Sequence, residues 1–204
     1  MEYRSDDLLR SWLLADSLNF TRYFFHSQNN GKRFVVGRHH RLICDKLNDV
    51  LRGKVKRLLI NIAPRYSKTE IAVKNFIAMG FAINPAAKFI HLSYSGLLAL
   101  DNSVAVKNII NSQEYQNLFD VQIGRSSDTK TRWDTYQGGG LYATSSLGQV
   151  TGFGAGSVGN EDNRFEFGGA IIIDDPIKPD MALNDNARES VNQHFETTIR
   201  NRVN

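Results

Sequence analysis

Residues 67–69, Ser-Lys-Thr, have the types and the setting that bind a triphosphate. An apolar run that begins at Arg57 precedes them, and a helical pattern follows directly. A strand, a tight turn and a helix in this order hold phosphate oxygens, because backbone N–H groups at the turn and the positive end of the helix dipole face the anion. A lysine there reaches the β- and γ-phosphates, and a Ser or Thr hydroxyl binds Mg²⁺. We therefore predict a strand from Arg57, a phosphate-binding turn, and a helix behind it.

The predicted turn lacks the glycines of the consensus G-x-x-x-x-G-K-[ST], since Ile62 and Ser67 stand at those positions. A positive φ angle costs glycine little and other residues more, so Ser67 would enter the turn at a conformational cost. Ser-Lys-Thr after an apolar run also begins many surface helices. Taken alone, this segment leaves nucleotide binding and an ordinary helix start as equal alternatives.

A second candidate segment ends in Asp174 and Asp175. The run before it, residues 170–173, is apolar without alternation, which is typical of a strand buried on both faces. Two adjacent carboxylates at the exit of such a strand are costly to desolvate unless a cation or polar ligand lies opposite them. A solvated acidic turn is the alternative, because Asp and Pro both favour turns. The lysine loop upstream favours the nucleotide site.

These segments resemble the ATPase half of the large terminase subunit of tailed bacteriophages. The resemblance extends from about Phe34 to Val203 and includes a deviant Walker A motif at residues 63–69 and a Walker B motif at residues 171–178. Residues 91–95 with 97–112, and residues 151–155, also contribute to it. Terminases commonly carry Pro-Arg in Walker A and depart from its strict glycines, so the irregular turn fits this family.

The resemblance implies an α/β fold, a three-layer P-loop NTPase of the RecA-like kind. Its central sheet would be mostly parallel with antiparallel additions. An N-terminal helical arm over residues 1–33 would precede an ATPase domain over residues 34–204. The resemblance further implies ATP and Mg²⁺ as ligands, with nucleotide contacts from Pro64, Arg65, Tyr66, Ser67, Lys68, Thr69 and His40. For His40 and its neighbour His39, a capping or surface role is an equal alternative.

Roles follow from what each side chain can do. Lys68 would neutralise charge on the β- and γ-phosphates, and Thr69 and Asp174 would hold Mg²⁺ directly or through water. Asp175 would position or deprotonate the attacking water, although terminases usually have Glu there and the shorter Asp would have to come closer by about one methylene. Glu189 is the alternative base. By the resemblance, Arg65 would stabilise transition-state charge within the same subunit, and a structural role is its alternative.

As an ATPase of this family, the protein would drive double-stranded DNA into a procapsid in the host cytoplasm. The resemblance implies a portal protein and a small terminase subunit as partners, and self-association into a ring on the portal. Because the family's coupling segment and nuclease domain would follow Val203, we expect a truncated ATPase portion that is monomeric alone, turns ATP over weakly and does not cut DNA.

Two other classes of function stay open. A helicase-like or recombinase-like ATPase would bind nucleotide and separate strands instead of packaging DNA. A degenerate module that has lost hydrolysis and serves as a scaffold is the second, and the residues that suggest it are Ser67 and Asp175.

Composition is compatible with these functions. The chain has 204 residues, 41% of them hydrophobic, which is enough for a sizeable core. Its net charge of +4 permits binding of a polyanion without requiring it. Cys44 is the single cysteine, so no internal disulfide can form, and the five histidines lack zinc-ligand spacing with it. No apolar run reaches the length of a membrane span, so we expect no membrane association.

Hydrophobic spacing predicts the remaining elements. Helices are expected near Ser5 and Asn19 and over residues 39–52, and the helix behind Lys68 should end at Asn84-Pro85. Residues 88–94 should form a strand and 97–111 a helix, giving the β-α-β-α order of a parallel sheet. The glycine-rich residues 138–169 should hold short strands at 141–144 and 149–151, with 131–137 pairing in front and a partly mobile loop at 156–165. The acidic residues Glu161, Asp162 and Glu166 are most simply a solvated loop.

Overall fold

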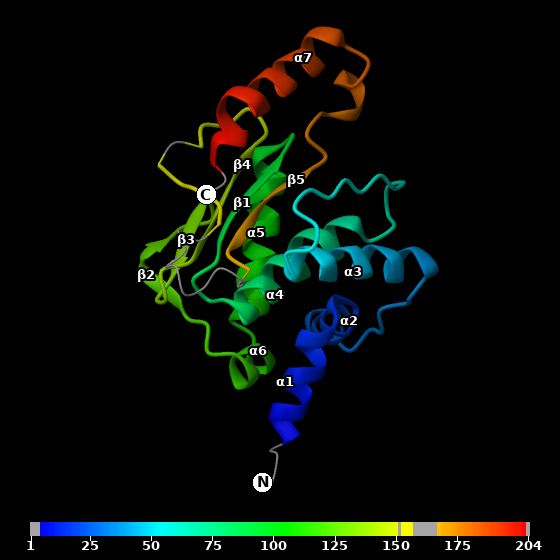
Figure 1. Cartoon of the computed structure of the whole chain (residues 1–204), viewed down its shortest axis with the longest axis vertical. Coiled ribbons are helices and arrows are strands. Elements are labelled where there is room, and N and C mark those ends of the chain that lie inside the picture. The colour runs from blue at the N-terminus through cyan, green and yellow to red at the C-terminus, as the bar shows by residue number, and fades with distance from the viewer. Residues whose placement is uncertain (1–4, 151, 157–166, 203–204) are drawn as a thin grey trace.

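A five-stranded mixed sheet forms the centre of the molecule (Figure 1). The computed structural model describes residues 5–150, 152–156 and 167–202. The strands lie in the order β2-β3-β4-β1-β5. Their bounds are Ile123–Asp128 for β2, Arg132–Thr135 for β3, Gly140–Ser145 for β4, Lys88–Ser93 for β1 and Gly169–Asp174 for β5.

The three strands β4, β1 and β5 are parallel, whereas β2 and β3 are antiparallel additions. In the register, Ser93 at the end of β1 lies beside Ser145 of β4 on one side and beside Asp174 of β5 on the other. The carboxyl ends of three strands therefore meet along one edge of the sheet. The expected strands at 88–94 and 141–144 are confirmed, and so is the pairing of residues before Gly138 with the strand that follows.

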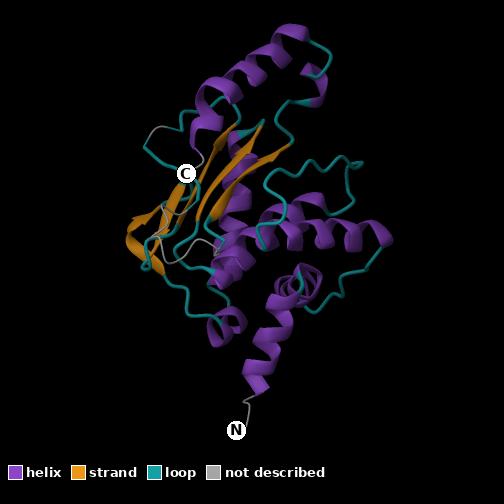
Figure 2. Ribbon diagram, in the orientation of Figure 1, coloured by secondary structure: helices purple, strands orange, loops and turns teal. Residues whose placement is uncertain are grey.

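Figure 2 shows helices beside the sheet and a further helical segment beyond the tips of its strands. Before β1 they are α1 (Ser5–Ala15), α2 (Ser17–Gln28), α3 (Arg38–Leu51), the π-helix η1 (Glu70–Asn75) and α4 (Phe76–Ile83). After β1 come α5 (Gly96–Ile110) and α6 (Gln113–Leu118). The chain then ends in η3 (Pro179–Met181), α7 (Asp185–His194), η4 (Phe195–Ile199) and η5 (Arg200–Arg202).

Local chemistry sets several of these boundaries. The Asp16 carboxylate accepts a hydrogen bond from the Leu18 N–H at 2.9 Å and caps α2, so this helix begins two residues before the expected Asn19. Gly53 follows α3 with φ +71°, a left-handed conformation that glycine adopts at little cost and that ends the helix. Asn84 and the following proline end α4, as the sequence predicts.

Two apolar clusters lie on the two faces of the sheet. The larger one joins Phe89 of β1 and Leu141 of β4 to the helices from α1 to α6. The smaller one joins Ile90 and Leu92 of β1 to Val150, Phe153, Ala155 and Ile199. The sheet thus has helices on one face and the segment around residues 150–155 with η4 on the other, an α/β arrangement compatible with three layers.

The strand predicted at residues 170–173 is present as β5, but its predicted burial on both faces is wrong, because β5 lies at the edge of the sheet and its apolar residues are half-buried or exposed. Two other predicted strands are wrong. Residues 57–62, expected as the first strand of the sheet, have no regular secondary structure, and residues 149–150 are likewise irregular. The apolar pattern of 57–62 is satisfied because alternate residues pack on the larger cluster without strand pairing. Thr151, the expected loop at 157–165 and the acidic residues Glu161, Asp162 and Glu166 lie outside the described residues. Among the described helices, none is long and apolar enough to cross a membrane.

Candidate functional site

Four side chains from two distant segments meet at the carboxyl edge of the sheet. The Lys68 ammonium lies 3.2 Å from a carboxylate oxygen of Asp174 and also forms an ion pair with Asp175. The Thr69 hydroxyl donates a hydrogen bond of 2.6 Å to the second oxygen of Asp174, across 105 positions of sequence. The structure therefore brings together the residues that the sequence predicts as the phosphate, Mg²⁺ and water-activating groups. We call Lys68, Thr69, Asp174 and Asp175 the lysine–aspartate cluster.

The parallel strands position the acidic half of the cluster. Asp174 is the last residue of β5, and β1 beside it ends at Ser93. The Tyr94 N–H donates to the Asp175 carbonyl at 2.9 Å, and the Ser146 hydroxyl donates to the Pro176 carbonyl at 2.7 Å. These two hydrogen bonds join the turns after β1, β4 and β5. Ligands in open α/β sheets bind outside the carboxyl ends of the strands, so the cluster lies at the expected edge.

The backbone around the cluster adopts left-handed conformations at non-glycine residues. The φ angles are +68° at Arg65, +60° at Ser67 and +47° at Asp175. This confirms the sequence prediction that Ser67 takes a conformation normally left to glycine. Such conformations cost free energy and concentrate at functional sites, because the surrounding structure must hold them. The helix that follows begins as the π-helix η1, a form that is also frequent at functional sites.

Charge in the cluster is dominated by acidic groups. The Asp174 side chain is 9% exposed and that of Asp175 is 61% exposed, so only the first carboxylate is removed from water. Burial lowers the pKa of Lys68, but hydrogen bonds and charges from Asp175 and Asp174 outweigh it and raise the pKa above its ordinary value of 10.5. Lys68 is therefore a cation at neutral pH, and it faces two carboxylates.

The other predicted nucleotide-binding residues lie around the same loop. Pro64 and Arg65 are exposed, and Arg65 makes no hydrogen bond or ion pair with any other residue that the structure describes. Tyr66 lies edge-on to the His39 ring, with ring centres 5.2 Å apart. The structure thus leaves the Arg65 guanidinium free to reach a ligand and links Tyr66 to the start of α3.

His40 lies next to this loop in a buried position. Its Nδ1 accepts a hydrogen bond from the Gly37 N–H at 2.8 Å, so Nε2 carries the proton of the neutral ring. Nε2 is buried and has no hydrogen-bond partner among the described residues. Burial, followed by the charge of His39, lowers the pKa of His40, with a partial opposing effect from the Tyr66 backbone. The predicted surface role for His40 is wrong, and its capping contact with Gly37 is present.

An apolar cleft of about 200 Å³ adjoins the lysine–aspartate cluster. Lys68 and Asp174 line one part of it, and residues 58–60 face β5 across it. Phe76 and Ala72 of the following helices also line it, as do Leu47 and Val50 of α3. The sequence predicts residues 58–60 only as a strand, so their place in the wall of a cleft was missed. The signal was the apolar run Leu58-Leu59-Ile60, but an apolar run does not say which surface it packs against.

A buried polar contact of His91 was not predicted from the sequence. His91 in β1 is fully buried, and its Nδ1 lies 3.3 Å from the Ile172 carbonyl of β5. Its Nε2 lies 3.1 Å from the Asn102 amide nitrogen of α5. With Asn102 as a donor to Nε2, the ring is neutral and donates to Ile172 from Nδ1. Burial lowers the pKa of His91, with opposing effects from the Ile172 carbonyl and the charge of Asp174.

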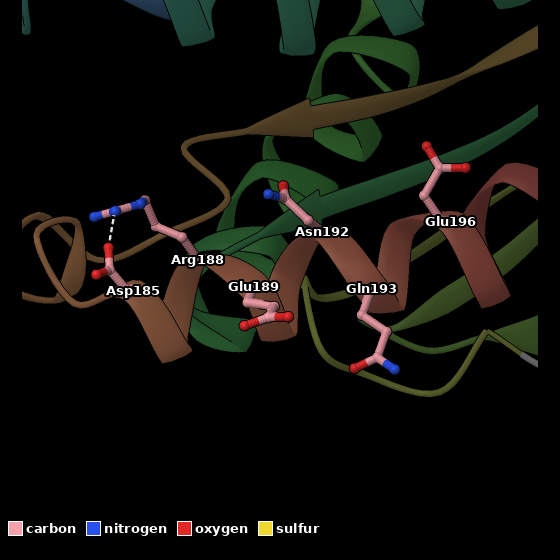
Figure 3. Close-up of a pocket in the computed structure, with 6 residues that line it drawn as sticks. All are labelled: Asp185, Arg188, Glu189, Asn192, Gln193 and Glu196. Atoms are coloured by element: carbon pink, nitrogen blue, oxygen red, sulfur yellow. Dashed lines mark hydrogen bonds and ion pairs between the residues drawn. The ribbon is translucent and has the colours of Figure 1, made fainter.

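Glu189, the alternative base, lies apart from the cluster. It belongs to α7 and shares a shallow polar depression with Asp185, Arg188, Asn192, Gln193 and Glu196 (Figure 3). All six lie on α7 and the start of η4, and Arg188 pairs with Asp185. No described contact joins Glu189 to Lys68 or Asp174. The geometry therefore favours Asp175 over Glu189 as the carboxylate nearest the phosphate loop.

No group of three or more His, Cys, Asp or Glu residues that could hold a metal ion occurs in the described part of the chain. The possible ligands at the cluster are the Thr69 hydroxyl and the Asp174 carboxylate, which are hard oxygen donors of the kind that Mg²⁺ prefers. No protein-family model matches the chain, and no curated protein matches it.

Proposed function

We propose that this chain is the ATPase portion of a DNA-packaging motor of the large-terminase kind. The observation that carries the proposal is the contact of Lys68 and Thr69 with Asp174, which joins a lysine loop to the acidic end of a parallel strand. A lysine, a hydroxyl and a carboxylate in this arrangement are what a magnesium triphosphate needs. The DNA substrate, the portal and the small subunit enter the proposal from the sequence resemblance alone.

In this function, Lys68 binds the β- and γ-phosphates once Asp175 gives up its ion pair. The hydroxyl of Thr69 and the carboxylate of Asp174 would hold Mg²⁺, because both are oxygen donors and lie 2.6 Å apart. When bound, Mg²⁺ would supply neutralisation of phosphate charge. Asp175 is more exposed than Asp174, and once its ion pair with Lys68 is broken it can orient water at the phosphate.

Arg65, Tyr66 and His39 complete the proposed site. The exposed Arg65 sits in the loop at φ +68°, where its guanidinium can approach the γ-phosphate as transition-state charge develops. Tyr66 and His39 present aromatic rings beside the loop, which a nucleobase could contact. Removal of Arg65 should therefore reduce turnover more than affinity.

Calorimetric titration of the intact chain with Mg·ATP tests the proposal. Lys68→Ala should abolish binding. The matched control is Lys74→Ala, since Lys74 also pairs with a carboxylate, Glu70 at 3.0 Å, but lies outside the cluster. Equal binding by Lys68→Ala and the control would refute the proposal.

Two further measurements separate the alternatives. Binding of Mg·ATP without turnover, even when DNA is added, would favour the non-hydrolysing scaffold. The structural support for this alternative is the ion pair between Lys68 and Asp175. Turnover coupled to unwinding of a forked DNA would favour a helicase. Loss of turnover in Asp175→Asn, with binding retained, would support the assigned role of Asp175.

A further inference from the structure

Positive charge is concentrated in one stretch of the chain. Residues 32–65 contain ten lysines and arginines and two acidic residues, which gives this stretch a net charge of +8. The whole chain carries +4, so the remaining residues together carry −4. The stretch comprises α3, the end of the connection before it and the loop after it. Charges of one sign that gather on one part of a surface raise the local potential and attract ligands of opposite sign.

The loop after α3 runs back along this helix. Near the carboxyl end of α3, Leu47 and Val50 line the cleft of about 200 Å³ together with Lys56 of the loop. Near the amino end, the centres of the His39 and Tyr66 rings lie 5.2 Å apart. Figure 1 shows α3 and this loop on the same flank of the molecule. The charges of the helix and of the loop therefore lie on one side of the protein.

Six cations on this flank have no partner in the part of the chain that the structure describes. Their residues are exposed and their side chains make neither an ion pair nor a hydrogen bond there; they are Arg38, Arg41, Lys54, Lys56, Arg57 and Arg65. We call these six residues the basic flank. By contrast, seven lysines and arginines outside residues 32–65 pair with described acidic residues. Asp49 pairs with Lys46 at 3.1 Å, so Asp45 is the one acidic residue of the stretch outside an ion pair.

Unpaired cations in this arrangement fit the phosphate backbone of a nucleic acid. With 14 residues, α3 is about 21 Å long, which matches about six base pairs of a duplex. Arg38 and Arg41 lie in its first turns, and Lys56 lies beside its other end. Four of the six cations are arginines, whose guanidinium groups bind phosphate oxygens through two parallel hydrogen bonds. The basic flank thus offers cations over the length of several successive phosphates.

An anionic membrane is the alternative ligand, because Leu42 and Leu59 are exposed on the same flank, at 63% and 92%. A helix that binds in a membrane surface buries its apolar face among the lipids. In α3 this face is already occupied, since Ile43, Cys44 and Leu47 pack on the larger apolar cluster. The structure therefore favours a nucleic acid.

We infer that the basic flank binds the phosphate backbone of duplex DNA without regard to base sequence. Exposed lysines and arginines that contact phosphates position a protein on DNA but do not read bases. Because Arg65 belongs both to the flank and to the phosphate loop, bound DNA would lie beside the lysine–aspartate cluster. The choice of duplex DNA among nucleic acids rests on the proposed function, whereas the place of the surface does not.

The salt dependence of DNA binding tests this surface. The full chain, without nucleotide, is titrated onto a fluorescent duplex of about 30 base pairs, and anisotropy gives the Kd over about 50 to 200 mM salt. Each phosphate contact contributes about 0.9 to the slope of log K against log salt. Arg38→Gln with Arg41→Gln, and Lys54→Gln with Arg57→Gln, should each reduce the magnitude of this slope by about 1.8. Each pair should also weaken binding at least about tenfold at the lower salt.

The matched control is Lys178→Gln with Arg200→Gln. It removes the same charge from exposed side chains that follow β5 and pair with Asp180 and Glu196. This control should leave the slope unchanged. Equal losses in the control and in the flank variants would show that net charge alone attracts DNA and would overturn the inference. Absence of DNA binding by the wild type at about 50 mM salt would overturn it as well.

Vesicles of phosphatidylcholine with about 30% phosphatidylserine test the membrane alternative by sedimentation. Vesicle binding that the flank variants weaken, with DNA binding unaffected by the same variants, would assign the flank to a membrane and overturn the inference. Failure of calorimetry to detect Mg·ATP would refute the proposed function instead. The DNA titration contains no nucleotide and would still decide whether the basic flank binds DNA.

Discussion

Replacing Ser67 by glycine should stabilise the protein, against the usual direction of substitutions in a folded chain. Ser67 has φ +60°, and a non-glycine residue pays roughly 1–2 kcal/mol in the left-handed region. Its hydroxyl makes no described hydrogen bond, while its carbonyl accepts one from the Ile71 N–H at 3.0 Å, which glycine would keep. The substitution therefore removes strain without removing a contact.

The unfolded state opposes part of this gain. Glycine is more flexible when unfolded and returns roughly 0.5–1 kcal/mol of the benefit. The net increase in the free energy of unfolding should be roughly 0.5–1 kcal/mol, the difference between these two effects. For a chain of 204 residues this corresponds to about 1–4 °C in Tm.

Urea denaturation of the wild type, Ser67→Gly and Ser67→Ala measures this effect. Ala keeps the Cβ atom that makes the conformation costly, so its midpoint should stay near or below that of the wild type. A Ser67→Gly variant no more stable than Ser67→Ala would show that the left-handed turn carries no strain in the folded protein, and the reasoning from φ would be refuted.

Two further predictions concern pH. Because its carboxylate partners raise the pKa of Lys68 above 10.5, the stabilisation they provide is complete at neutral pH and is lost as pH rises through the folded-state value. The stability difference between wild type and Lys68→Met, measured in urea at pH 8 and pH 11, should shrink at the higher pH, and a constant difference would contradict the ion pairs. Burial lowers the pKa of His91 below 6.5, so the wild type should lose stability as pH falls through 6.5 toward the folded-state value. His91→Gln should lose less over pH 7 to 5 by the same assay, and parallel curves would show that His91 does not titrate on unfolding.

The chemistry of the lysine–aspartate cluster could be predicted from local sequence. An apolar run that ends in two aspartates indicates a strand with its charge at one end, and Ser-Lys-Thr before a helix indicates a phosphate loop. The meeting of Lys68 with Asp174 was predicted as well, although the strand expected before Lys68 is absent and only Asp174 lies on a parallel strand. The strained φ of Ser67 followed from its place in the consensus in the same way.

Other features depended on contacts between distant segments. Residues 57–62 have the composition of a strand, but a strand exists only where another backbone accepts its hydrogen bonds, and β5 does not do so here. The packing of neighbouring elements likewise decides that His40 and His91 are buried. It also decides that Lys68 forms an ion pair with Asp175. The sequence by itself determined which residues can do chemistry and where most helices and parallel strands lie. Only the tertiary structure decided which backbone groups are paired and which charges are neutralised, because both depend on neighbours that lie far away along the chain.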